Sequence, residues 1–264
     1  KPKIEQNLPS IVSVDGDHGF APYALELGLP VLAKAAEDTG IAILKISNSF
    51  HFAALWPETE FLADKGLIGI ACTAAKPMVA PAGAKKAFFG TNPLSFAWPR
   101  KESTPIVFDM ATSTLAMGDV QIAARDGHAV PPGTGLGPDG NPTDDPTEII
   151  KGVLLPFGGY KGSAISLMVE LLSAGLTGDN FSYEAGAKDN NDGGPPKGGE
   201  LIIAISPTLV AGNEWSNHSE MFLTKLKNMD GVRIPGERRH KNRLDQGPRF
   251  INKAMLDKVK QLLE

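Results

Sequence analysis

The sequence of 264 residues contains a single cysteine, Cys72, and no long hydrophobic run. One cysteine builds neither a disulfide framework within the chain nor a cysteine-rich zinc site, which favours a reducing, cytoplasmic setting. Cys72 lies in the apolar run Leu67-Ile-Gly-Ile-Ala-Cys-Thr, so we expect a buried thiol with no nucleophilic role. Every apolar stretch is shorter than the roughly 20 residues of a membrane helix, and we expect no membrane partner.

Several functional motifs are also missing. The five histidines show no His-x-x-His or His-Glu-x-x-His spacing, so no metal site is expected. No Gly-x-Gly-x-x-Gly follows the first predicted strand, so the Rossmann fingerprint is absent. The Gly-x-Ser-x-Gly motif that would indicate a hydrolase is also absent. The net charge of −4 argues against a nucleic-acid partner.

Glycine and proline are plentiful, 29 and 21 residues, and they separate many short elements, which is typical of a mixed α/β enzyme. Alternating apolar runs predict strands at 10–14, 40–47, 67–75, 94–98, 105–110 and 200–205. Helical patterns cover 23–39, a stretch ending at 65, 113–125, 163–173, 217–229 and 250–263. We expect the first helix to break near Gly28 and Pro30, the helix at 163–173 to be buried all round, and loops at 128–145 and 183–199.

The first candidate site is Asn48-Ser-Phe-His-Phe-Ala-Ala-Leu55, where a predicted strand leads through a polar turn into a helix. Free backbone N–H groups at such a helix start suit a pyrophosphate, and His51 is placed to donate a hydrogen bond. An ordinary strand–loop–helix junction explains the same residues equally simply.

Two further segments follow strands. In Gly90-Thr-Asn-Pro, the Thr91 hydroxyl and Asn92 amide suit a carboxylate, although the motif also reads as a plain turn. In Phe108-Asp-Met-Ala-Thr-Ser, a strand runs into a helix, and Asp119 is expected about two turns into it. A carboxylate among apolar residues tends to pair, for example with histidine, whereas the alternative is a solvated aspartate.

Two segments suit phosphate. Phe157-Gly-Gly-Tyr-Lys-Gly162 places glycines and a lysine at a helix start, without P-loop spacing. Gly236-Glu-Arg-Arg-His-Lys-Asn-Arg243 holds four full positive charges within six residues of an acidic protein. Paired arginines are suited to a 2′-phosphate, which favours NADP(H) over NAD(H); a solvated basic loop is the alternative.

In this order the segments resemble one family, the malate/L-lactate dehydrogenase-like oxidoreductases. The resemblance covers essentially the whole chain. The stretches at 50–55, 160–169 and before Gly198-Gly-Glu-Leu are most similar to the family's Δ1-piperideine-2-carboxylate/Δ1-pyrroline-2-carboxylate reductases.

The resemblance implies a mixed α/β (α+β) fold with a non-Rossmann, predominantly antiparallel sheet flanked by helices, and it implies a homodimer. We expect a connecting, substrate-side segment at 1–40, an NADP(H)-binding and catalytic domain at 41–245, and a C-terminal helix at 246–264. That helix carries an apolar stripe at Ile251, Met255, Val259 and Leu262, which requires a partner surface.

The resemblance also implies roles for individual residues. Thr91 matches a substrate-contacting position, and Asp119 matches the acidic member of a Ser–Asp–His relay. The positions that match cofactor-contacting segments are His51, Phe52, Ala53, Ala54, Leu55, Asp109, Met110, Ala111, Tyr160, Lys161, Gly236, Glu237, Arg238, Arg239, His240, Lys241 and Asn242.

One family motif has no counterpart here. The Ser-His-Gly motif, which supplies the serine and the proton-donating histidine, belongs to an N-terminal helical segment together with a substrate-contacting arginine. His18, in Asp17-His-Gly, lies in a different, turn-like segment. We therefore expect the chain to be a piece of a longer enzyme, which binds NADPH but scarcely turns over, and whose C-terminal helix packs with the missing segment.

The function that these residues and the resemblance imply is NADPH-dependent reduction of cyclic imino acids. Δ1-Piperideine-2-carboxylate would yield L-pipecolate, and Δ1-pyrroline-2-carboxylate would yield L-proline. One alternative is an NAD(P)-dependent dehydrogenase of malate, lactate or ureidoglycolate. Another is a non-catalytic NADP(H)-binding fragment.

Overall fold

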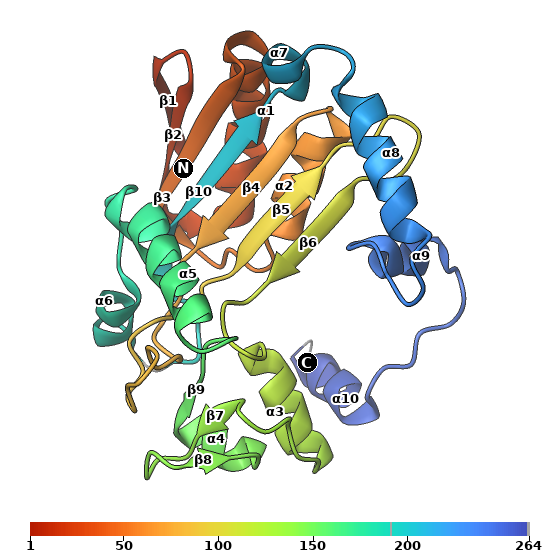
Figure 1. The fold of residues 1–264 in the computed structure, drawn as a ribbon. Coiled ribbons are helices and arrows are strands. Elements are labelled where there is room, and N and C mark those ends of the chain that lie inside the picture. The colour runs from red at the N-terminus through yellow and green to blue at the C-terminus, as the bar shows by residue number, and fades with distance from the viewer. Residues whose placement is uncertain (191, 263–264) are drawn as a thin grey trace.

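The structure, a computed structural model, describes residues 1–190 and 192–262. Its largest part is a seven-stranded sheet with the strand order β1-β2-β3-β10-β4-β5-β6 (Figure 1). β2 and β3 are parallel, and all other neighbouring strands of this sheet are antiparallel, which confirms the expected non-Rossmann fold. The strands are β1 (Lys3–Leu8), β2 (Ile11–Phe20), β3 (Ile41–Phe50), β4 (Ile68–Thr73), β5 (Leu94–Trp98), β6 (Ile106–Met110) and β10 (Lys197–Ile205).

Two helices cover one face of this sheet. α1 (Ala21–Thr39) packs on β2 and β3, and α2 (Trp56–Asp64) packs on β4 and β5. Alternate side chains of the strands point to these helices because successive residues of a strand face opposite sides. They form the main core, which includes Val12, Val14, Leu32, Leu44, Ile46, Leu62 and Ile202.

α1 runs without a break through Gly28 and Pro30, so the predicted interruption is wrong. Pro30 is exposed, and its ring lies on the solvent side of the helix. A Cβ at Gly28 would lie 2.8 and 2.9 Å from the two methyl groups of Leu44. Gly28 therefore allows a close approach of helix and sheet, and does not end the helix.

The opposite face of the sheet is only partly covered. α5 (Tyr160–Glu170) and the π-helix η1 (Leu171–Gly175) pack on β10 and β4 through Val169 and Leu172. α8 (Trp215–Lys227) lies along the far edge, where Trp215 meets Trp98. Helix α5 was expected to be buried all round, which is wrong, because its outer side chains Leu167 and Met168 are 50% and 41% exposed.

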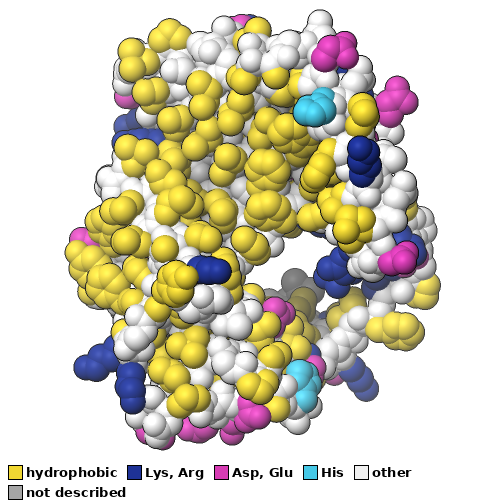
Figure 2. Space-filling model, viewed as in Figure 1, with side chains coloured by type: hydrophobic (Ala, Val, Ile, Leu, Met, Phe, Trp, Pro, Cys, Tyr) yellow, Lys and Arg dark blue, Asp and Glu magenta, His cyan; other side chains and the backbone are white. Residues whose placement is uncertain are grey.

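Between these helices the sheet shows a broad apolar surface, seen as yellow atoms in Figure 2. Its side chains form a row across five strands because their residues pair in register. All five are only half-buried. We call this row the open sheet face; its members are Ile43, Ile203, Ile70, Phe96 and Phe108.

A smaller lobe lies below the sheet in Figure 1. Three two-residue strands, β7 (Gly135–Leu136), β8 (Pro142–Thr143) and β9 (Val153–Leu154), form a second sheet. α3 (Met117–Asp126) and α4 (Pro146–Lys151) pack against it around Val120, Ile149 and Leu154. The prediction of a loop at 128–145 is thus partly wrong, because two short strands lie within it.

The remaining helices are α6 (Ser182–Ala187), α7 (Pro207–Ala211), α9 (Glu237–Leu244) and α10 (Lys253–Gln261). α6 begins at Ser182 and covers the start of 183–199, and β10 begins at Lys197, so the prediction of a loop there is partly wrong. β1 was not predicted. The apolar stripe of the C-terminal segment is exposed, with Met255 55% and Val259 54% accessible. Within the described ranges no helix has the length and apolar character to cross a membrane.

The boundaries proposed at residues 40 and 245 stay a prediction. β2 and β3, which lie on either side of residue 40, are neighbours in one sheet.

Candidate functional site

The start of α2 is held by the carboxylate of Asp109, at the end of β6. Its Oδ2 accepts hydrogen bonds from the backbone N–H groups of Leu55 at 2.8 Å and Trp56 at 3.0 Å. These are the N–H groups that were expected to be free for a pyrophosphate. That expectation is wrong, since Asp109 already satisfies them and joins the segment 51–55 to the segment 109–111.

Three acidic side chains gather below this helix start. Glu200 is fully buried and Glu58 is 3% exposed, and both oxygens of Glu200 and Oε2 of Glu58 have no hydrogen-bond partner among the described residues. Burial, together with the charge of Asp109, raises the pKa of Glu58 to about 7. Burial and the charges of Glu58 and Asp109 raise the pKa of Glu200 well above its usual range. The uncompensated carboxyls are stable there in the protonated form.

A second cluster lies on the other side of α2, around the indole of Trp56. The guanidinium groups of Arg239 and Arg243 lie over its ring at 4.5 and 5.4 Å from the ring centre. Both arginines also bind Glu60, at 3.0 Å and 2.6 Å. Burial alone would raise the pKa of Glu60, but the hydrogen bond from Arg243 and the charges of both arginines lower it. The cluster therefore holds an ionised glutamate and two arginines in fixed positions.

A cavity of about 490 Å³ opens beside this cluster and is lined by Trp56, Arg239, Asn242, Arg243, Asp245 and Arg249. Its guanidinium groups are suited to phosphate, and the Trp56 ring that they cover helps to hold them in position. The Nε atom of Arg239 is buried and has no partner among the described residues. These residues fit the adenosine end of a nicotinamide dinucleotide.

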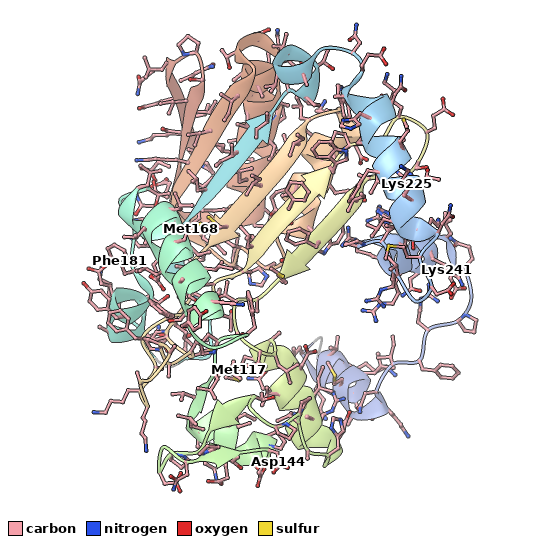
Figure 3. All side chains as sticks on the ribbon, in the orientation of Figure 1. Met117, Asp144, Met168, Phe181, Lys225 and Lys241 are labelled. Atoms are coloured by element: carbon pink, nitrogen blue, oxygen red, sulfur yellow. The ribbon has the colours of Figure 1, made fainter. Side chains whose placement is uncertain are left out.

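The residues predicted at 236–242 have different environments within and around α9. Arg238 and Lys241 are exposed, and Figure 3 labels Lys241 on this helix. His240 is 9% exposed, and its Nε2 bonds the carbonyl of Pro105 at 3.0 Å, so it joins α9 to the strand β6 region. Glu237 pairs with Lys227 at 3.1 Å. Gly236, at φ +91°, forms the turn into α9.

Thr91 lies in the turn just before β5, next to the end of the edge strand β6. Its carbonyl accepts hydrogen bonds from the backbone N–H of Thr112 at 2.8 Å and from the Thr112 hydroxyl at 3.0 Å. Thr112 directly follows the predicted cofactor residues Met110 and Ala111. The carbonyl of Thr112 in turn accepts from the N–H of Phe157 at 3.1 Å. These bonds bring the turn of Thr91 next to two predicted cofactor segments.

Tyr160 and Lys161 form the first turn of α5 and are exposed, Tyr160 by 73%. They follow Gly158 and Gly159, whose φ angles of +57° and +64° turn the chain into the helix. Lys161 thus presents its ammonium at a helix N-terminus, and its role in binding an anion stays a prediction.

The segment 51–55 has an unusual backbone. His51 and Ala53 have φ angles of +64° and +54°, in the left-handed region that non-glycine residues rarely adopt. His51 is exposed and meets Phe20 edge to face, with ring centres 6.2 Å apart. Phe52 and Leu55 are buried in the main core, and Ala53 and Ala54 are exposed. Strained backbone of this kind is common at ligand sites.

Asp119 differs from its prediction. α3 begins at Met117, so Asp119 lies in its first turn, and the predicted position two turns inside the helix is wrong. Asp119 is exposed, which agrees with the alternative of a solvated aspartate. Residues 113–116 are not helical because they pair with the strand region of the lobe, where the N–H of Thr114 bonds Leu155 at 2.9 Å. Among the described residues, no hydrogen bond or ion pair joins the Asp119 side chain to the other candidates. Figure 2 shows a hollow between the lobe and the body of the molecule, and Figures 1 and 3 place α3 and α9 on opposite sides of it.

Sequence reasoning missed Trp56, Glu60, Glu58 and Glu200. Trp56 directly follows the predicted segment, and Arg243 belongs to the basic run although it lies outside the predicted residues. Glu200 is followed by the apolar run 201–205 in the sequence, and a glutamate in such a strand could have indicated a buried carboxyl. Glu60 gave no signal. No group of His, Cys, Asp and Glu in the described part of the chain is arranged to hold a metal ion.

Comparison with known proteins shows the family of this chain. The model of the malate/L-lactate dehydrogenase family matches residues 1–258. The chain is 44% identical over 245 residues to a Δ1-pyrroline-2-carboxylate reductase of Ancylobacter novellus, with 92% of this chain and 72% of the relative covered. It is 46% identical over 243 residues to a Δ1-pyrroline-2-carboxylate/Δ1-piperideine-2-carboxylate reductase of Pseudomonas putida, with 92% of this chain and 71% of the relative covered.

A solved structure is similar throughout. The Δ1-piperideine-2-carboxylate reductase of Pseudomonas syringae pv. tomato superposes with a TM-score of 0.91 at 44% identity, over 99% of this chain and 80% of that one. The resemblance seen in the motifs is confirmed. This chain belongs to the malate/L-lactate dehydrogenase family of oxidoreductases, whose dehydrogenases use a nicotinamide cofactor.

Proposed function

We propose that the protein reduces Δ1-piperideine-2-carboxylate to L-pipecolate and Δ1-pyrroline-2-carboxylate to L-proline with NADPH. The observation that carries the proposal is the identity of 46% to a relative named for both substrates, over 92% of this chain. The arrangement of the site supports it, because the segments 51–56, 109–112, 157–161 and 236–243 are joined by the contacts described above.

NADPH is proposed over NADH because of the charges at α9. Arg239 and Arg243 line the cavity at Trp56, and Arg238 and Lys241 add two exposed cations on the same helix. Guanidinium groups bind the two oxygens of a phosphate at once, so a 2′-phosphate gains contacts that a 2′-hydroxyl lacks. The bound cofactor supplies the hydride, and the protein's part is to align it with the substrate carbon.

For the substrate end, we assign Thr91 to the carboxylate. Its hydroxyl is the polar group left on a residue whose carbonyl is already bonded to Thr112. Asp119 is assigned as the acidic partner that orients a proton-donating histidine and stabilises its charged form. The exposed position of Asp119 leaves it accessible to such a partner.

We also propose a homodimer that works in the cytoplasm. The open sheet face is apolar and wide, and surfaces of this kind mark association sites in soluble proteins. The cytoplasmic setting is proposed because the chain has a single cysteine and therefore no internal disulfide.

The test is turnover with equal NADPH of the two cyclic imino acids against pyruvate and oxaloacetate, followed by absorbance of the cofactor, in an enzyme that includes the proton-donating Ser-His-Gly segment. Faster turnover of an imino acid supports the proposal. Faster turnover of a keto acid would favour the alternative, a 2-hydroxy acid dehydrogenase, which the family's name also describes.

A further inference from the structure

A buried polar network surrounds the turn that carries Thr91. Its centre is Glu170, the last residue of α5, which is 4% exposed and lies where the α-helix passes into the π-helix η1. π-Helical turns within helices are often found at functional sites. Charged side chains are rarely buried without partners, so the partners of Glu170 indicate what it does.

Glu170 accepts three hydrogen bonds. Oε1 accepts from Asn92 Nδ2 at 2.9 Å and from the Ser182 hydroxyl, and Oε2 accepts from the Ser182 backbone N–H at 2.9 Å. Asn92 and Ser182 are themselves fully buried. Three donors therefore point at one buried carboxyl, which fixes its position relative to Asn92 and Ser182.

The same network reaches the other side of Thr91. The Ser182 hydroxyl, which donates to Glu170, accepts from the backbone N–H of Gly90 at 2.9 Å. Both chain neighbours of Thr91 are thus tied to Glu170, Asn92 directly and Gly90 through Ser182.

The turn needs this support because its backbone is strained and tightly packed. Asn92 has a φ angle of +41°, in the left-handed region, and a Cβ at Gly90 would lie 2.8 Å from the backbone nitrogen of Ala75. Such a conformation persists where the surroundings fix it. Thr112, which binds the Thr91 carbonyl, is held by Ser166 of the same helix α5, with 2.7 Å between their hydroxyl oxygens.

We propose that Glu170 is a positioning residue, which holds the Thr91 hydroxyl at the place where the substrate carboxylate binds. Glu170 acts only through the turn, since it does not reach the surface. This inference rests on the proposed contact between Thr91 and the substrate. It adds a residue that no sequence motif indicated.

A double-mutant cycle tests the proposal on purified enzyme that includes the Ser-His-Gly segment, using whichever 2-carboxylate acid the wild type reduces. Glu170→Gln replaces one acceptor by an amide that opposes the Ser182 N–H, and it should raise the KM for the acid on the order of 10- to 100-fold, as small misplacements do. The dissociation constant of NADPH, measured by fluorescence, should stay within about twofold. Adding Glu170→Gln to Thr91→Ala should change the KM little further.

Ser173→Ala is the matched control. Ser173 is fully buried in η1, and its hydroxyl bonds the carbonyl of Val169 at 2.8 Å without touching the turn. It should leave the KM near that of the wild type. Glu170→Asp, which keeps the charge, should recover part of the loss, and it replaces the glutamine variant in the cycle if that variant does not fold.

Additive effects of the two substitutions, or an equal loss of NADPH affinity, would overturn the proposal and leave Glu170 a structural residue. Failure of the proposed function looks different, because the wild type itself would then reduce a keto acid in place of the imino acids. The cycle run with that keto acid still decides the role of Glu170.

Discussion

Arg238 and Arg239, the predicted pair of arginines in α9, differ because only the charge of Arg239 is compensated by a carboxylate. Arg239 is fixed between Glu60 and Trp56, whereas Arg238 is exposed. An arginine already placed by a buried carboxylate loses little further freedom when it binds a phosphate. Glu60 thus prepares Arg239 and Arg243 for an anion.

We expect the double substitution Arg238→Ala and Arg239→Ala to weaken NADPH binding from several-fold to about a hundredfold, since a charge-assisted contact contributes roughly 1.5–3 kcal/mol. NADH binding should change much less, and both are measured by fluorescence titration. Arg233→Ala, at an exposed position before α9, is the control. Equal losses for the two cofactors would contradict the assignment of the 2′-phosphate.

Glu58 makes the stability of the protein depend on pH. Burial raises its pKa from 4.5 to about 7, so between these values the folded protein keeps a proton that the unfolded chain has released. The folded state then binds more protons than the unfolded state, and the free energy of unfolding falls as the pH rises through this window.

Glu58→Gln should remove this dependence. Between about pH 5 and pH 8 the wild type should lose up to about 3 kcal/mol more stability than the variant, measured by urea unfolding. Glu37→Gln, on the exposed side of α1, should follow the wild type. Parallel curves for wild type and Glu58→Gln would show that the Glu58 carboxyl is ionised throughout.

At the scale of elements, α2 depends on a cap that comes from a distant strand. Leu55, its N-cap, has no side chain that accepts a hydrogen bond, and the carboxylate of Asp109 takes that place. Caps of this kind stabilise a helix by about 1–2 kcal/mol.

Asp109→Ala should therefore lower the free energy of unfolding by about 1–2 kcal/mol. The free energy of unfolding is measured near pH 5. At this pH Glu58 keeps its proton, so the loss of Asp109 does not also remove a repulsion between two carboxylates. Asp144→Ala, at an exposed position of the small lobe (Figure 3), is the control. An unchanged stability would mean that water replaces the cap.

Helices and strands were predicted correctly where neighbouring residues alone determine them. The run Leu94–Trp98 was predicted at its observed bounds, because alternation within the run is enough to define a strand. The start of α3 was misplaced, because residues 113–116 pair with a segment some forty positions later, as Thr114 does with Leu155. The unbroken α1 depends on the fit of Gly28 against Leu44, which the sequence does not show.

The same reasoning separates the parts of the site. The order of the motifs was enough to recognise the family, whereas the partners of their side chains were not predictable. Arg239 and Glu60 are 179 positions apart, and Glu170 and Asn92 are 78 apart. Such pairs arise from the topology of the sheet, and no short motif contains both members.

On the scale of the whole molecule, the open sheet face offers a direct test of self-association. Ile203→Lys places a charge within this row, between Ile43 and Ile70. We expect it to convert a dimer into a monomer in sedimentation equilibrium, because an unpaired charge at an apolar interface costs several kcal/mol.

Leu209→Lys serves as the control, since Leu209 is 57% exposed on α7, outside the row. It should leave the dimer intact. A wild type that sediments as a single chain at all concentrations would refute the proposed homodimer.

The position of β10 has a consequence for synthesis on the ribosome. β10 is the last of the seven strands to be made, yet it lies between β3 and β4 and pairs with both. Until it emerges, the earlier strands form two separate groups, each with an unpaired edge of the kind that promotes aggregation. Growing chains should therefore engage chaperones until residue 205 has left the exit tunnel, and refolding should be slow because its central pairings span most of the chain.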